Sequence, residues 1–253
     1  MVIIKSIKEI EVVAASGRIL AKVFNGVLKQ VKIGARLEDL DRLARRLIEE
    51  YGGQPAFLGY QPDGASVPYP ATICASVNDT VVHGLPLNYI LKSGDVLKLD
   101  FGVKYKGMYS DSAKTIIIGD VSKTAKQLVR TTEKALEEAI KQAISGNHLG
   151  DIGWTISRCV KKAGFNVAEG LTGHGIGFEL HEEPTIYNFG KKASGIELKS
   201  GMVLAIEPMV CVGNGKIIKR KDNSYATADG SLSAHFEHTV VITELGNRIL
   251  TVL

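Results

Sequence analysis

One ten-residue segment occurs twice in this chain. LKSGDVLKLD at residues 91–100 returns as LKSGMVLAIE at residues 198–207, with six of the ten residues identical and a carboxylate, Asp100 or Glu207, at the end of each copy. Glycine at a turn followed by an apolar, β-branched run is typical of a strand. The offset of 107 positions indicates an internal duplication, with halves of about residues 1–120 and 121–253. The alternative is a recurrent turn-to-strand motif in an unduplicated chain.

The order of the predicted elements repeats in the same way. Apolar residues at helical spacing and end signals such as the capping box Ser6/Glu9 predict helices over about residues 8–29, 37–51, 122–145 and 151–162. β-Branched runs predict strands within residues 74–84, 94–105, 106–119, 201–212 and 236–244. The proline-rich residues 54–70 predict a long ordered loop. We therefore expect one α+β domain over residues 1–253, with pseudo-twofold symmetry, a mostly antiparallel central sheet and helices on the outside.

Composition excludes several classes of protein. Apolar and charged fractions of 45% and 23% are those of a globular protein, and no run approaches the ~20 apolar residues of a membrane span. The net charge of +4 is too small to indicate a DNA-binding protein. Three scattered cysteines and an N-terminus without a secretory pattern lead us to expect a cytoplasmic protein. We also expect it to be a monomer.

Two acids flank a predicted hairpin turn in LDFGVKYKGMYSD. If the two-residue loop is Tyr105-Lys106, Asp100 lies directly opposite Asp111, and opposed residues have Cβ atoms about 4.5–5.5 Å apart. Two buried anions at that distance need either a shared proton or a dication between them. The other interpretation is that both acids face solvent.

Further acids and a histidine favour a metal. Glu207 and Glu237 are isolated charges in apolar strands, where desolvation penalises an acid without a partner. His174 lies in LTGHGIG, among glycines that let the backbone approach a ligand. Four carboxylates and one imidazole suit divalent Mn, Fe, Co or Zn, and five ligands exceed what one tetrahedral ion needs. Two ions about 3.5–4 Å apart would use all five ligands.

Four other histidines lie in or near these motifs. His83 follows a predicted strand, and His181 follows His174 by seven residues. Each of them alone is better explained as a hydrogen-bonded core histidine, but as a set with the acids they favour a metal hydrolase. His235 and His238 flank Glu237, and we expect them to point to the opposite face or to have a supporting role.

With these residues, the chain resembles the type I methionine aminopeptidases, which have the pita-bread fold. The resemblance extends from IKEIEVVAASGRIL to the terminal ILTVL, and the motifs that carry it are CASVNDTVVHGLP, LDFGV…SDSAKT, GHGIG…LHEEP, IEPM and FEHTVVIT. It implies a cytoplasmic hydrolase that removes the initiator methionine from nascent chains.

The resemblance also implies a ligand set and a reaction. Asp111 and Glu237 would bridge two divalent ions, Asp100 would bind one of them, and His174 and Glu207 would complete the other. The nucleophile would be a water that bridges the ions, with Glu207 accepting its proton and passing it to the leaving amine. The α-amino group of the substrate would reach the ion at Asp100, which restricts the enzyme to chain ends.

Other residues are implied to contact substrate. His181 would donate a hydrogen bond to the scissile carbonyl oxygen, and His83 would contact the amide nitrogen of the second residue. Tyr69 and Cys74, with Tyr60 beside them, would line the methionine pocket. The pocket departs from the family pattern in a longer loop GYQPDGASVPYP, in Leu180 where an aromatic residue is typical, and in a missing tryptophan within KDNSYAT.

Two other functions are compatible with parts of this pattern. A prolidase or Xaa-Pro aminopeptidase shares the metal set, but CASVNDTVVHGLP favours the methionine enzyme. A binding protein on a catalytically dead peptidase fold would have lost metal ligands, and none of the five is missing. The basic segment KIIKRKD, with Lys216, Lys219, Arg220 and Lys221, is interpreted as a solvated hairpin tip or a transient ribosome contact.

Overall fold

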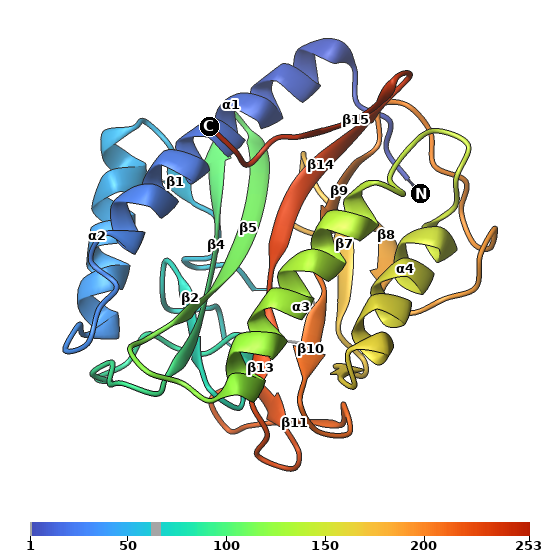
Figure 1. Cartoon of the computed structure of the whole chain (residues 1–253). Helices are drawn as coiled ribbons and strands as arrows, with labels where there is room; N and C mark the ends of the chain where they lie inside the picture. The colour runs from blue at the N-terminus through green and yellow to red at the C-terminus, as the bar shows by residue number, and fades with distance from the viewer. Residues whose placement is uncertain (1, 62–66) are drawn as a thin grey trace.

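The computed structural model describes residues 2–61 and 67–253 of the 253. Four helices surround a curved sheet, with α1 and α2 beside β4 and β5, and α3 and α4 beside β14, β9 and β7 (Figure 1). The helices are α1 (Ile7–Leu28), α2 (Leu37–Glu50), α3 (Lys123–Ile140) and α4 (Leu149–Lys162). None of these helices, which lie in the described part of the chain, has the length and apolar character needed to cross a bilayer.

The strands form one large and two small antiparallel sheets. The large sheet has the order β1-β4-β5-β14-β9-β7-β8, with β2 added at β4 and β15 at β14. Its strands are β1 (Gln54–Pro55), β2 (Cys74–Val77), β4 (Val96–Tyr105), β5 (Met108–Ile117), β7 (Thr172–Gly175), β8 (Glu182–Tyr187), β9 (Val203–Ile206), β14 (Glu237–Thr243) and β15 (Gly246–Ile249). The small sheets contain β13 (Ser233–His235), β10 (Met209–Cys211) and β6 (Asn166–Val167), and β11 (Ile217–Lys219), β12 (Tyr225–Thr227) and β3 (Thr80–Val82).

Alternation along β4 separates the core from the acids. Leu97, Leu99 and Phe101 are fully buried in the cluster under α1 and α2, and the ring of Phe101 stacks on Phe24 at 4.2 Å. Because successive side chains point to opposite faces, Asp100 lies on the face turned away from these helices. The predicted α+β class, antiparallel sheet and external helices are confirmed.

The two LKSG copies occupy corresponding places. Gly94 and Gly201 both have positive φ, at +101° and +89°. Each donates its N–H to a carbonyl near the end of a neighbouring strand, Ile118 for Gly94 and Ile242 for Gly201, at 2.9 Å in both cases. Such matched hydrogen bonds support the proposal that the halves arose by duplication within one domain.

The β4–β5 register differs from the one we considered. The two-residue turn is Lys106–Gly107, with φ values of +48° and +83°, and Tyr105 pairs with Met108. Two successive positive φ values are what a tight hairpin turn of matching twist requires, and glycine provides one of them without strain. Asp111 therefore lies opposite Gly102 and not opposite Asp100, which pairs with Ala113.

Three other expected elements have different limits. Helix α3 ends at Ile140, five residues before the predicted end. The strand expected over residues 201–212 is divided into β9 and β10 at Glu207 and Pro208, because proline cannot donate to the sheet ladder. The strand expected over residues 74–84 is likewise divided into β2 and β3. Part of the predicted loop 54–70, residues 62–66, lies outside the described residues.

Candidate metal centre

Asp100 and Asp111 lie on one face of the β4–β5 hairpin, diagonally across the two strands. Asp100 is 8% exposed and Asp111 is 3% exposed. The backbone of Asp111 is fixed by Thr239, whose hydroxyl accepts from its N–H at 2.9 Å and donates to its carbonyl at 2.8 Å. The Ser112 N–H donates to Asp111 Oδ1 at 2.9 Å. Both carboxyl groups are thus held inside the protein.

The second half of the chain adds two more acids. Glu237 begins β14 beside β5, pairs with Ala113, and is 2% exposed. Its carbonyl accepts a hydrogen bond from Ser112 Oγ at 2.8 Å. Glu207 stands in the break between β9 and β10, and its carbonyl accepts from Asn188 Nδ2 at 3.0 Å. The proline that follows Glu207 ends β9, so Glu207 lies outside the regular hydrogen-bond ladder of the sheet.

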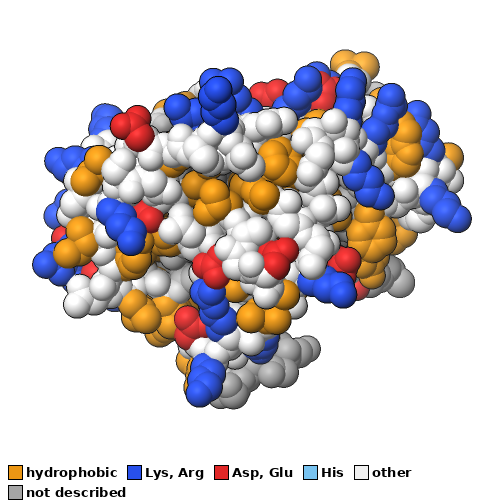
Figure 2. Space-filling model, turned by 60° about the horizontal axis from the view of Figure 1, so that its bottom comes forward, with side chains coloured by type: hydrophobic (Ala, Val, Ile, Leu, Met, Phe, Trp, Pro, Cys, Tyr) orange, Lys and Arg blue, Asp and Glu red, His pale blue; other side chains and the backbone are white. Residues whose placement is uncertain are grey.

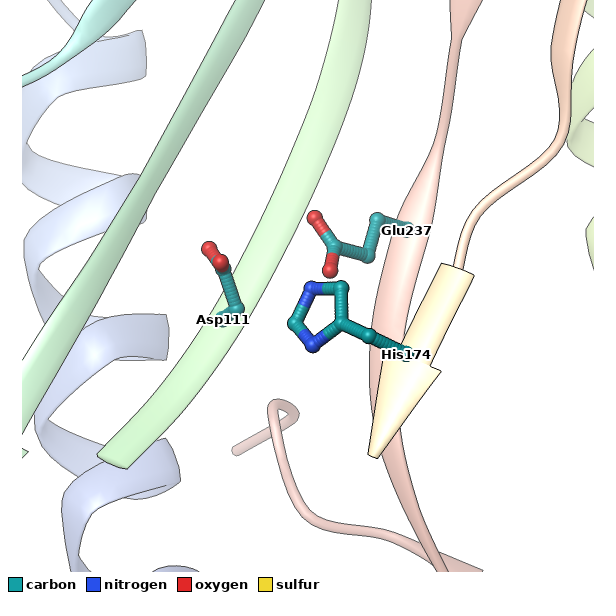
Figure 3. A group of neighbouring side chains, drawn as sticks. All are labelled: Asp111, His174 and Glu237. Carbon is teal, nitrogen blue, oxygen red and sulfur yellow. The ribbon is translucent and has the colours of Figure 1, made fainter. Parts of the chain in front are cut away.

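His174 enters the group from β7, as Figure 3 shows for Asp111, His174 and Glu237. Its Nδ1 lies 2.8 Å from the carbonyl oxygen of Gly175, which can only accept, so Nδ1 carries the proton. Nε2 therefore has a free lone pair, and it lies 3.5 Å from Glu207 Oε1. A Cβ on Gly173 would lie 2.4 Å from the carbonyl oxygen of Ala205, so glycine is needed for β7 to approach β9.

Burial dominates the electrostatics of the four acids. It raises the pKa of Asp100, Glu207 and Glu237 well above their ordinary values, and the charge of Asp111 adds to the effect in each case. Burial also raises the pKa of Asp111 to about 7, although the Ser112 N–H acts in the opposite direction. Four acids in this environment need either protons or cations.

His235 is a member of the site that sequence reasoning did not assign. We expected it to point to the opposite face from Glu237 or to have a supporting role. It lies instead on β13, which is separate from β14, and its Nε2 is 3.2 Å from Glu207 Oε2. Burial lowers the pKa of His235 to about 3, so its ring is neutral. His238 faces away from the acids, and its Nδ1 lies 2.7 Å from the hydroxyl of Thr251.

The donor atoms fit divalent ions. Asp111, His174 and Glu237 offer ligand atoms within 4.8 Å of one another, and so do Glu207, His235 and Glu237. Glu237 belongs to both groups. Among the described residues, the buried Asp100 Oδ1, Glu237 Oε1 and both His235 nitrogens have no hydrogen-bond partner; the His235–Glu207 contact is close without hydrogen-bond geometry. Orphaned buried oxygens beside neutral imidazoles are what an absent cation would leave.

His83 and His181 lie at the exposed edge of this group. Both side chains are exposed, whereas the acids are buried or nearly so. The ring centroids of His181 and His174 are 4.3 Å apart, and His83 lies 5.7 Å from the ring of Tyr225. The Tyr60 hydroxyl lies 2.6 Å from His181 Nδ1. Both histidines are therefore placed to meet a ligand that approaches the acids from solvent.

The predicted pocket residues are also gathered here. Tyr69 donates its N–H to the Tyr60 carbonyl at 2.8 Å, which brings the two tyrosines together. Cys74 is buried and pairs with Asp100 across β2 and β4. Leu180 is 1% exposed. Tyr225, in KDNSYAT, contacts His83 and occupies the region where the sequence lacks tryptophan.

Comparisons with known proteins agree with this geometry. The family model of metallopeptidase family M24 matches residues 11–244. The methionine aminopeptidase of Aquifex aeolicus is 44% identical, with 97% of both chains covered, and that of Clostridium perfringens is 40% identical over the whole of both. The crystal structure of methionine aminopeptidase from Thermotoga maritima superimposes with a TM-score of 0.96 at 41% identity over all of both chains. Prolidase from Pyrococcus furiosus, at 23% identity and a TM-score of 0.80, shares the fold; the match covers 99% of this chain and 66% of the prolidase.

Proposed function

This chain belongs to metallopeptidase family M24, and on that premise we propose that it is a methionine aminopeptidase that removes the initiator methionine from nascent proteins. The observation that carries the proposal is the group of four inward carboxylates beside a neutral imidazole. Relatives of about 40% identity over the full chain are methionine aminopeptidases. The same arrangement is difficult to explain as structural support, since buried acids without cations destabilise a fold.

The family implies the use of divalent metal, and the donor set supports a dinuclear site. Asp111 and Glu237 would bridge two ions of Mn, Fe, Co or Zn, Asp100 would bind one, and His174 and Glu207 would complete the other. Glu237 belongs to both groups of close ligand atoms, as a bridging residue should. When bound, such ions supply Lewis acidity and lower the pKa of a water molecule, which makes it a nucleophile at neutral pH.

Glu207 is the residue that we assign to proton transfer. Its two carboxylate oxygens lie 3.5 Å from His174 Nε2 and 3.2 Å from His235 Nε2. Both imidazoles are neutral, because burial lowers the pKa of His174 to about 4 and that of His235 to about 3. Glu207 can accept the proton of the attacking water and return it to the leaving amine.

His181 and His83 would contact the substrate. The Tyr60 hydroxyl, by donating to His181 Nδ1, would place the remaining imidazole proton on Nε2. His181 would then donate a hydrogen bond to the scissile carbonyl oxygen as negative charge develops there. His83, whose ring lies beside that of Tyr225, would contact the amide nitrogen of the second residue.

The side chain of the initiator methionine would be bound by Tyr60, Tyr69 and Cys74. Tyr69 is oriented by its hydroxyl, which donates to the carbonyl oxygens of Ile73 at 3.0 Å and Gly84 at 3.1 Å. Cys74 is a small buried thiol beside Asp100, so a methionine held there has its α-amino group near the metal ligands. That position of the amine would confine cleavage to the first peptide bond.

Peptide turnover tests this function. The tripeptide Met-Ala-Ser should be cleaved after methionine by the metal-loaded protein, and an Ala-Pro peptide should not. Cleavage of the Ala-Pro peptide alone would replace the proposal with a prolidase. If protein purified under reducing conditions binds no divalent ion, the chain is instead a binding protein on an inactive peptidase fold.

We extend the proposal to the molecule as a whole. It would act as a cytoplasmic monomer with one catalytic domain, and would contact the ribosome through Lys216, Lys219, Arg220 and Lys221 of the β11–β12 hairpin. Arg220 already binds Asp79 at 2.5 Å, which leaves the three lysines for RNA. Figure 2 shows Lys and Arg spread around the rim of one face without a single dominant patch, so the contact would be weak. Unchanged co-sedimentation with ribosomes after neutralisation of these four residues would remove it.

A further inference from the structure

A lysine near the start of the chain is buried against an acid from the second half. Lys5 lies two residues before α1, and its Nζ contacts Glu182 Oε2 at the start of β8. The two side chains are only 1% and 4% exposed. The first residues of a domain are usually exposed, and a lysine is seldom buried without a specific partner. Figure 1 shows the N-terminus on the side of the molecule where β8 lies.

The carboxylate of Glu182 also holds the turn that precedes it. Its Oε1 accepts the N–H of Phe178 at 2.6 Å and the N–H of Glu179 at 3.1 Å. One oxygen therefore fixes the turn, and the other contacts the ammonium of Lys5. Leu180 and His181 lie between this turn and Glu182, so the backbone on both sides of His181 depends on Glu182.

Two glycines make the passage of Lys5 possible. A Cβ on Gly177 would lie 2.6 Å from Lys5 Cε, and a Cβ on Gly201 would lie 2.9 Å from the Lys5 carbonyl oxygen. Lys5 also donates its backbone N–H to the Gly201 carbonyl at 2.9 Å. The lysine is thus inserted between the turn of His181 and the second LKSG copy, with both its main chain and its side chain fixed.

His181 precedes β8, and its imidazole has few other contacts. Its side chain is exposed, its Nδ1 meets Tyr60, and its ring lies against His174. The direction of its Nε2 therefore depends on these two contacts and on the backbone of residues 177–182, which carries the ring. A small change in this backbone moves Nε2, and a displacement near 1 Å is enough to cost a large factor in rate.

We propose that Lys5 is a positioning residue for His181, which it orients through Glu182. The inference rests on the proposed function in one respect, that His181 contacts the scissile carbonyl oxygen. An interaction with that oxygen strengthens in the transition state, so its loss lowers kcat more than it changes KM. Among the described residues, Lys5 has no hydrogen bond or ion pair with the proposed metal ligands, so metal content should not depend on it.

The test replaces Lys5 with methionine, which keeps most of the apolar stem and removes the ammonium. We expect kcat for Met-Ala-Ser to fall at least about 10-fold, less than the 10²–10³-fold typical for removing an oxyanion donor. KM and the bound metal should be nearly unchanged. Lys8→Met is the matched control, because Lys8 is an exposed lysine three residues away, and it should keep the wild-type kcat.

A double-mutant cycle separates positioning from general support of the fold. If Lys5 acts through His181, Lys5→Met should have no further effect on kcat once His181 is alanine. Equal effects of Lys5→Met in both backgrounds would overturn the proposal, as would a wild-type kcat in Lys5→Met. If Lys5→Met does not fold, Lys5→Arg, which keeps a cation for Glu182, should retain most of the activity, and its failure to do so would contradict the proposal.

Amide hydrogen exchange gives a readout that does not depend on activity. The N–H groups of Phe178 and Glu179 should exchange faster in Lys5→Met, because an unpaired Glu182 carboxylate is drawn towards solvent, whereas the N–H groups of the β4–β5 hairpin should be unaffected. Unchanged exchange at both turn positions would overturn the inference. If the wild type does not cleave Met-Ala-Ser but exchange is faster in the variant, the proposed function is wrong. The inferred link from Lys5 to the turn would then still hold.

Discussion

Removal of divalent ions should make the stability of this protein decrease as the pH rises. Burial raises the pKa of Asp111 from 3.8 to about 7, and raises the pKa of Asp100, Glu207 and Glu237 well above their ordinary ranges. An acid whose pKa is raised by folding contributes stability that is fully present below its unfolded pKa and is lost as the pH rises through its folded pKa. Metal-free protein should therefore be less stable at neutral and alkaline pH.

The size of the effect follows from the same values. Each acid that is protonated in the folded chain and ionised in the unfolded chain lowers the unfolding free energy by about 1.4 kcal/mol per pH unit. For Asp111, the interval from 3.8 to about 7 corresponds to a loss on the order of 4 kcal/mol. That is a large part of the roughly 5–15 kcal/mol that stabilises a typical domain.

Buried basic side chains have the opposite effect on the pH dependence of stability. They determine the pH range in which the effect of the acids can be measured. Burial lowers the pKa of His174 and His238 to about 4 and that of His235 to about 3, so their contribution is lost only as the pH falls below 6.5. Burial lowers the pKa of Lys98 to about 7, so its contribution grows with pH between 7 and 10.5. Lys98 contributes equally to the stability of the metal-free and metal-loaded forms, so its contribution cancels when their stabilities are compared.

The assay is chemical unfolding of chelator-stripped and Mn²⁺-loaded protein at pH 6.5, 7.5 and 8.5. We expect the stability difference between the two forms to widen with pH, because bound cations keep the carboxylates ionised without penalty. In Asp111→Asn, which removes one of the acids, the metal-free form should lose stability less steeply up to about pH 7, where the contribution of Asp111 to the pH dependence ends. A difference that is constant or that narrows with pH would refute the reasoning.

Three substitutions test separate parts of the site. Glu207→Gln should lower kcat for Met-Ala-Ser by about 10²–10⁴-fold even where metal is retained, and near-normal turnover would exclude it from proton transfer. His83→Ala should keep its metal, as measured by elemental analysis, while turnover falls, since His83 is exposed beside the ligands; loss of metal would show that its role is wrong. Gly173→Ala should destabilise the protein by about 1–3 kcal/mol in urea unfolding, because its Cβ would lie 2.4 Å from the Ala205 carbonyl oxygen, and unchanged stability would argue against this close approach.

The fold could be predicted to the extent that local patterns determined it. The LKSG repeat and the helical stripes gave the class and the antiparallel sheet, because glycine turns and apolar periodicity are local properties. The register of β4 and β5 could not be obtained in this way, since a shift of the turn from Tyr105-Lys106 to Lys106–Gly107 moves every cross-strand pair. The end of α3 at Ile140 was equally hidden, because the apolar spacing continues to Ala143, which is buried beyond the helix.

The site was predicted through isolated charges in apolar strands. Asp100, Asp111, Glu207 and Glu237 were each conspicuous for that reason, and the structure brings all four together with His174. His235 was given only the opposite face or a supporting role, although strand alternation places residues two positions apart, such as 235 and 237, on the same face. The two-residue spacing from Glu237 was the available signal, and the structure places the buried His235 at the end of β13, one residue before β14 begins.

The central claim is that these buried carboxyl groups exist to hold divalent ions. Calorimetric titration of the stripped protein with Mn²⁺ at pH 7, in two buffers of different ionisation enthalpy, measures both the number of ions bound and the number of protons released. We predict two ions per chain and a net release of protons, because each ligand carboxyl group must ionise to bind. Absence of Mn²⁺ binding would contradict the account. So would binding without proton release, if the stripped protein also cleaves Met-Ala-Ser as well as the metal-loaded protein.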